Sequence, residues 1–125
     1  MKAVNPDVYK SICPSRQVLK RIGDKWTVLI MGILERGKIR FGALRRETEG
    51  ISQKMLTQTL RNLERDGLIK REVFAEVPVR VEYSLTELGK SLIPIIKPLI
   101  LWSQSHLLEI EAAQNLYDRS QNVVK

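Results

Sequence analysis

The chain is poor in the residues that build disulfides, metal sites and catalytic centres. Its 125 residues include one cysteine, Cys13, and one histidine, His106. One cysteine cannot close an intramolecular disulfide, and one cysteine with one histidine cannot supply the four ligands of a structural zinc site. The sequence also lacks the GxSxG, P-loop and HExxH patterns. We therefore expect no enzymatic activity, no bound metal and no cofactor.

Long apolar runs are also missing. No stretch reaches the roughly 18 apolar residues that cross a bilayer, and the segment MKAVNPDVYKSICPS lacks the continuous apolar stretch of a secretory leader. We expect a cytoplasmic protein with no membrane association. Hydrophobic residues make up 43% and charged residues 28% of the chain, which is typical of a globular protein, and 125 residues suit one domain.

Positive charge is concentrated in the middle of the chain. The net charge is +7 at pH 7. Residues 36–71 hold ten basic and four acidic residues, whereas residues 72–125 hold five basic and seven acidic ones. A basic block inside a folded domain is typical of a surface that binds a polyanion such as nucleic acid. A solvated charged face without a partner is the alternative.

Apolar spacing and capping residues predict the order of the elements. The first part comprises a helix over 15–22, a helix capped by Asp24 and closed by Gly37, a brief edge strand around Arg40, and a helix over 41–47. A helix from Ser52 to Asp66 follows, and then a hairpin after Leu68. The last helix is capped by Thr86 and kinked at Pro94 and Pro98, and we expect the chain to fray from Asp118. This order is that of a winged helix-turn-helix, an α+β fold that is mostly α, with a two-stranded β-hairpin wing and extra terminal helices for dimerisation.

The fourth helix has two chemically distinct faces. Leu56, Leu60 and Leu63 form a narrow apolar stripe that can fix the helix to the core. Polar and cationic side chains occupy the opposite face, as the helix of a winged helix-turn-helix requires when it enters the major groove. Apolar residues on that face would instead favour a winged helix that binds a protein. Because the face has none, the sequence favours double-stranded DNA as the partner.

The polar side chains of this helix have known preferences on DNA. Lys and Arg pair with guanine O6 and N7, Gln pairs with adenine N6 and N7, and Thr contacts a phosphate or a thymine methyl. Free amides at the start of a helix can hold a phosphate. The candidate DNA contacts on the helix are Ser52, Gln53, Lys54, Thr57, Gln58 and Arg61, and Arg40 is a further candidate.

Three segments resemble a known family. IGDKWTVLIMGIL, RFGALRRETEGISQKMLTQTLRNLERDGLIKR and VPVRVEYSLTELGKSL look like the HxlR-type winged-helix regulators, relatives of the MarR group, in the same order and spacing. The resemblance covers about residues 13–108. It implies a homodimeric bacterial or archaeal transcription factor, with one winged-helix domain over residues 1–125 and flexible termini.

The resemblance also implies how DNA is bound. Residues 52–66 would be the recognition helix in the major groove, and residues 76–81 would be a wing on the backbone or minor groove. The wing tip would carry Arg80 from the VPVRVEY run. The family pattern often reads VPPRVEY, so Val79 stands here in place of the second proline.

A dimer interface has support from the residues themselves. The last helix holds more apolar side chains than one face can bury, and a dimer doubles the contacts with DNA. Large aromatic side chains are enriched at such interfaces. Trp102 is therefore the central candidate, although it could also be a core residue. The full set of candidates is Val18, Leu19, Leu99, Trp102, Leu107 and Ile110.

Cys13 has two interpretations. Some HxlR-type members sense oxidants or electrophiles through an N-terminal cysteine, and the resemblance includes a Cys-Pro pair, here Cys13-Pro14. A helix start with Lys10 and Arg16 nearby would lower the pKa of the thiol and make it a possible redox sensor. An inert, partly buried thiol is the alternative. With one cysteine in the chain, any disulfide is intermolecular.

Overall fold

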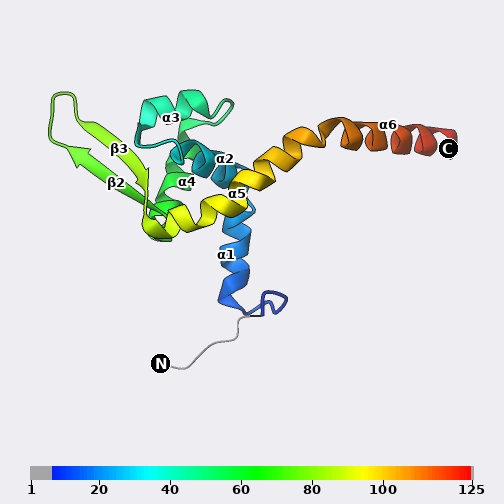
Figure 1. The fold of residues 1–125 in the computed structure, drawn as a ribbon, viewed down its shortest axis with the longest axis horizontal. Helices are drawn as coiled ribbons and strands as arrows, with labels where there is room; N and C mark the ends of the chain where they lie inside the picture. The colour runs from blue at the N-terminus through cyan, green and yellow to red at the C-terminus, as the bar shows by residue number, and fades with distance from the viewer. Residues whose placement is uncertain (1–6, 125) are drawn as a thin grey trace.

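Three of the described helices begin at a residue whose side chain caps the helix. The computed structural model describes residues 7–124. In this range the elements are α1 (Pro14–Ile22), α2 (Lys25–Leu34), β1 (Ile39–Arg40), α3 (Phe41–Glu47), α4 (Gln53–Arg65), β2 (Ile69–Phe74), β3 (Arg80–Leu85), α5 (Glu87–Ser105) and α6 (Leu107–Val124) (Figure 1). Asp24 Oδ1 accepts the amides of Trp26 and Thr27, and Ser52 Oγ accepts the amide of Met55. The predicted winged helix-turn-helix order is confirmed up to α5.

The core forms where α4 packs against α2. Leu56, Leu60 and Leu63 are all buried, as their spacing predicts. Side chains of α2 form the other half of this layer, and Ile30 and Met31 are fully buried. Burial of each such side chain stabilises the fold by about 1.5–3 kcal/mol. The polar face of α4 is consequently held outward.

The hairpin belongs to a small antiparallel sheet with the order β1-β3-β2. Ile39 of β1 pairs with Tyr83, which confirms the predicted edge strand, and Phe74 of β2 pairs with Arg80. The loop over residues 75–79 joins β2 to β3 at the end of the hairpin that lies far from α4 (Figure 1). We call β2, this loop and β3 the wing.

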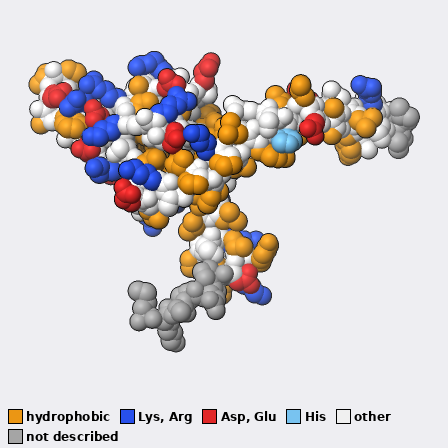
Figure 2. Space-filling model, in the orientation of Figure 1, with side chains coloured by type: hydrophobic (Ala, Val, Ile, Leu, Met, Phe, Trp, Pro, Cys, Tyr) orange, Lys and Arg blue, Asp and Glu red, His pale blue; other side chains and the backbone are white. Residues whose placement is uncertain are grey.

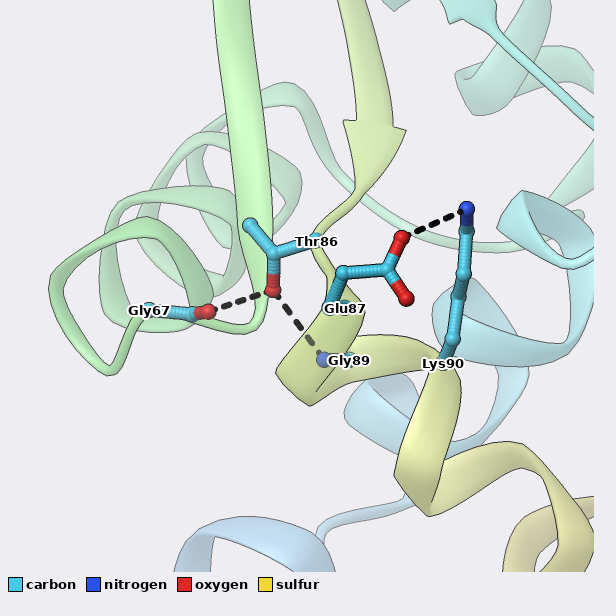
Figure 3. Close-up of polar contacts among 5 residues, drawn as sticks. All are labelled: Gly67, Thr86, Glu87, Gly89 and Lys90. Carbon is cyan, nitrogen blue, oxygen red and sulfur yellow. Dashed lines mark hydrogen bonds and ion pairs between the residues drawn. The ribbon is translucent and has the colours of Figure 1, made fainter.

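Thr86 joins three elements at the base of the wing (Figure 3). Its Oγ1 donates to the carbonyl of Gly67, at 2.6 Å, and accepts the amide of Gly89, at 3.0 Å. Gly67 ends α4 with φ of +77°, a conformation that favours glycine. Gly89 faces the carbonyl of Leu68 so closely that a Cβ would overlap that oxygen. The turn after α4 and the start of α5 are thus held together.

The C-terminal region differs from the prediction of one kinked helix. α5 contains both Pro94 and Pro98, and the chain leaves helical geometry at His106, where φ is −107° and ψ is 8°. The His106 ring stacks on Trp102 with 4.5 Å between centroids, and its Nδ1 lies 3.0 Å from the Trp102 carbonyl oxygen.

None of the described helices is long and apolar enough to span a membrane.

The predicted fraying from Asp118 is not observed. α6 continues to Val124 as an unbroken helix. The flexible termini expected at residues 1–6 and at Lys125 lie outside the described residues. α1 and α6 both project away from the body of the molecule (Figure 1).

Gly89→Ala tests the contact at the base of the wing. Glycine to alanine inside a helix normally stabilises a protein by up to about 1 kcal/mol. At Gly89 the new methyl would meet the Leu68 carbonyl, so we expect the free energy of unfolding to fall by at least about 2 kcal/mol in urea denaturation. Gly42→Ala in α3 is the matched control, because its Cβ would meet only Arg46 Nη1 at 3.6 Å. Equal effects of the two substitutions would contradict the close contact.

Candidate nucleic-acid interface

The outer face of α4 brings five of the predicted DNA contacts together. Gln53, Lys54, Thr57, Gln58 and Arg61 line one shallow hollow on the surface. All are exposed except Thr57, which is half-buried. Within residues 7–124, neither Lys54 nor Arg61 takes part in an ion pair. Two cations and two amides are therefore available to a ligand in this hollow.

Ser52 lies next to this hollow but its side chain has another task. Its Oγ accepts the Met55 amide at 3.0 Å and so caps α4. Removing such a cap costs about 1 kcal/mol. Ser52 thus helps to form α4. It is exposed beside Gln53, as a residue predicted to contact DNA should be.

A second hollow connects α4 to the wing. Thr57, Arg61 and Glu64 line it from the helix, and Arg71 and Tyr83 line it from the sheet. Arg71 Nε lies 3.7 Å from Glu64 Oε1. Burial raises the pKa of Tyr83, so its phenol is neutral near pH 7. Arg71 was not among the sequence-predicted candidates, because its alternation with Lys70 and Glu72 gives its face of β2 but not its register partner, Tyr83.

The two arginines predicted on the sheet, Arg40 and Arg80, lie on either side of Glu82. Arg40 is exposed on β1 and is the register partner of Glu82. Arg80 is 26% exposed, and its Nη1 lies 3.4 Å from Glu82 Oε2. Its Nη2 lies 3.1 Å from Glu76 Oε1, and its guanidinium carbon lies 4.0 Å from the centroid of the Phe74 ring. Arg80 is thus at the wing, as predicted, but it is held by neighbours.

The partners of Arg80 were not foreseen from the sequence. Glu82 follows Arg80 by two residues on one strand, so both side chains lie on the same face. Phe74 is the cross-strand partner of Arg80, which brings their side chains together. The hairpin prediction contained this signal, but the register that reveals it depends on the loop length.

α1 contacts α4 away from the outer face. Arg21 Nε lies 2.7 Å from Asp66 Oδ2, which joins the end of α1 to the end of α4. The cleft between the two helices is lined by Gln17, Lys20 and Met55, among others. Met55 is the exposed large apolar side chain of α4. It faces this cleft and is not among the residues lining the outer hollow.

The predicted interface residues are exposed. Trp102 is 53% exposed, so it is not a core residue. Val18 and Leu19 on α1 are more than half exposed. Apolar side chains are seen along the projecting α5–α6 segment, whereas Lys and Arg gather over the body (Figure 2). Exposed apolar residues of these ends that were not predicted are Tyr9, Ile12, Leu101, Leu108, Leu116 and Tyr117, and the predicted Leu99, Leu107 and Ile110 are exposed as well.

Cys13 is the half-buried N-cap residue of α1. Its Sγ lies 2.9 Å from Ser15 Oγ. This hydrogen bond is the main cause that lowers the pKa of the Cys13 thiol below its ordinary value, while burial opposes it. The charges of Lys10 and Arg16, which the sequence offered as the cause, do not produce the shift. The pKa of Cys13 is shifted in the direction expected for a reactive thiol, but the cause is the Ser15 hydroxyl, which stabilises the thiolate.

Comparison with known proteins identifies consistent similarities. The family model described as HxlR-like helix-turn-helix matches residues 21–111. An HTH-type transcriptional regulator of Methanothermobacter thermautotrophicus is 48% identical over 95 residues, which is 76% of this chain and 72% of that protein. The regulator YtfH from Salmonella typhimurium superposes with a TM-score of 0.85 at 40% identity, over 89% of this chain and 99% of that one.

The similar solved structures include a redox regulator. HypR in its oxidised form superposes with a TM-score of 0.69 at 45% identity, covering 74% of this chain and 96% of that chain. The residues that the family model matches include α2, α3, α4 and the wing.

The hydrogen bond of Cys13 predicts the pH dependence of its alkylation. Because the pKa is lowered, the rate of reaction with iodoacetamide should reach half of its maximum at a lower pH than in an unstructured cysteine peptide. Ser15→Ala removes the hydroxyl and should move this midpoint to higher pH. Ser11→Ala, at an exposed serine two residues before Cys13, should leave the midpoint unchanged. A midpoint that does not change in Ser15→Ala would contradict the Ser15 hydrogen bond as the cause of the lowered pKa.

Proposed function

Because the chain belongs to the HxlR-like helix-turn-helix family of transcriptional regulators, we propose that it reads a specific double-stranded DNA site as a homodimer. In this proposal α4 enters the major groove and the wing lies over the backbone or minor groove. The observation that carries it is the hollow of Gln53, Lys54, Thr57, Gln58 and Arg61, whose cations are unpaired within residues 7–124 and whose helix is anchored by buried leucines.

The chemistry of this hollow suits base edges. The major groove is about 12 Å wide and admits a helix with its side chains. Arg61 and Lys54 can donate to guanine, and the Gln53 and Gln58 amides can pair with adenine. Gln58 Nε2 now donates to Asn62 Oδ1 at 3.2 Å, an exposed contact that a base can replace. Thr57 would contact a phosphate or a thymine methyl.

Arg40, Ser52 and Arg80 would position the protein on the backbone. Phosphate contacts supply affinity without reading sequence, and they respond strongly to salt. Arg40 is exposed beside the start of α3, and Ser52 stands at the positive end of the α4 dipole. The polar outer face of α4 argues against a protein-binding winged helix, because Met55, its exposed apolar residue, faces the cleft with α1.

The two projecting ends support the homodimer. α1 and the α5–α6 segment carry large apolar side chains that are exposed in one copy of the chain. Large apolar side chains that gather on an exposed surface are typical of a protein interface. A twofold dimer would place two copies of α4 on half-sites separated by about 10 base pairs or a multiple of that spacing.

A second function, a response to oxidants or electrophiles through Cys13, is favoured by the hydrogen bond from Ser15. The similarity to HypR supports the same idea. A thiolate is the reactive form of cysteine, and with one cysteine per chain the product would be an intermolecular disulfide or a modified thiol. The alkylation profile decides whether the thiol has the required reactivity.

Arg61→Ala and Arg80→Ala should differ in their effects on DNA binding. The operator is first selected from a random duplex pool with the wild-type protein. Loss of a base contact at Arg61 should relax preference at one base-pair position by about 1–3 kcal/mol. Arg80→Ala should weaken binding to all duplexes and reduce the salt slope by about 1. Gel-shift titrations measure both, and equal wild-type affinity for every duplex would contradict sequence-specific binding.

Trp102→Glu should separate the dimer. A buried charge in place of a central aromatic residue costs at least about 2 kcal/mol, which raises the dimer dissociation constant about 30-fold. Sedimentation equilibrium over a range of concentrations measures this change. Val77→Glu, at a fully exposed apolar residue of the wing loop, is the matched control and should leave the dimer intact. If Trp102→Glu associates as tightly as the wild type, α5 is not part of the dimer interface.

A further inference from the structure

The guanidinium of Arg80 already has anionic partners in the free protein. Glu76 Oε1 lies 3.1 Å from Nη2, and Glu82 Oε2 lies 3.4 Å from Nη1. The Phe74 ring covers the face of the guanidinium, at 4.0 Å from its centroid. A phosphate that approaches Arg80 therefore meets a cation whose two outer nitrogens are occupied by carboxylates.

The two carboxylates differ in how firmly they are held. Glu82 lies within β3, is 18% exposed, and has Glu72 and Arg40 as its register partners on the neighbouring strands. Glu76 lies in the loop of the wing and is 52% exposed. Movement of the Glu76 side chain leaves the strand pairing unchanged, so Glu76 is the partner that another anion can replace.

The two carboxylates also do not use every donor of Arg80. Its Nε is buried and has no hydrogen-bond partner within the described residues. A buried donor without an acceptor costs free energy, so Glu76 and Glu82 do not satisfy the guanidinium completely. A phosphate offers several oxygens in the geometry that a guanidinium prefers and can form a bidentate pair.

We propose, on the basis of the proposed DNA binding, that Glu76 sets the DNA affinity of the wing by occupying Arg80 in the free protein until a DNA phosphate replaces it. Glu76 is a positioning residue in this exchange, since it acts through Arg80 and does not itself contact DNA. The exchange lowers affinity for every duplex, because phosphates carry no sequence information. Sequence reading by α4 then accounts for a larger share of the total affinity for the operator, while the ratio of the operator and random-duplex affinities is unchanged.

The size of the effect follows from the exposure of the pair. Exposed ion pairs contribute up to about a fivefold change in an equilibrium constant. Glu76→Gln keeps the size of the side chain and removes its charge. We expect Glu76→Gln to bind duplex DNA about twofold to fivefold more tightly, by similar factors for the selected operator and for a random duplex.

The experiment is a double-mutant cycle on the full chain. Fluorescence anisotropy with labelled operator and random duplexes would compare wild type, Glu76→Gln, Arg80→Gln and the double variant. In the Arg80→Gln background the gain from Glu76→Gln should vanish. Glu87→Gln is the matched control, because Glu87 is also in an exposed ion pair, with Lys90 at 3.2 Å, and its removal changes the net charge equally. Arg80→Met, which keeps an unbranched chain over the Phe74 ring and removes the cation, provides a second background if Arg80→Gln lowers the melting temperature.

Each outcome separates the possibilities. A gain that persists without Arg80, or that Glu87→Gln reproduces, means simple charge repulsion and overturns the exchange. Wild-type binding with no gain in Glu76→Gln overturns it as well, while the proposed function stands. Failure of every variant to bind any duplex overturns the proposed function and the exchange together.

Discussion

The packing of α4 on α2 is the interaction on which the rest of the structure depends. Leu56, Leu60 and Leu63 occupy one stripe of the helix and are all buried against side chains such as Ile30 and Met31. Because this stripe is narrow, the outer face of α4 remains exposed. The same three leucines thus fix the orientation of Lys54, Gln58 and Arg61, which need no contacts of their own with the core. A substitution that leaves a cavity beneath α4 would therefore disturb the polar face of the helix, although no residue of that face is changed.

Local signals in the sequence predicted most of the fold. Asp24, Ser52 and Thr86 each cap the helix that the sequence assigned to them, and the change of period after Leu68 marks β2. These features depend on residues within one or two turns of each other. The break at His106 was missed, because it involves a ring stacked on Trp102 and a backbone geometry for which no glycine or proline gives a signal.

The candidate site was predicted unevenly for the same reason. The face of α4 follows from helical spacing alone, and the structure brings five of its predicted residues into one hollow. The surroundings of Arg80 and Arg71 depend on strand register and on the distance between wing and helix, which periodicity does not supply. Cys13 is an intermediate case: the direction of its pKa shift followed from position, but the responsible hydroxyl of Ser15 required coordinates.

The ion pair between Arg21 and Asp66 gives α1 a mechanical role. It ties the last turn of α1 to the C-cap of α4, while Cys13 lies at the other end of α1. Nine helical residues span about 13 Å. α1 is therefore a rigid link of about this length between the Cys13 thiol and the C-cap of α4.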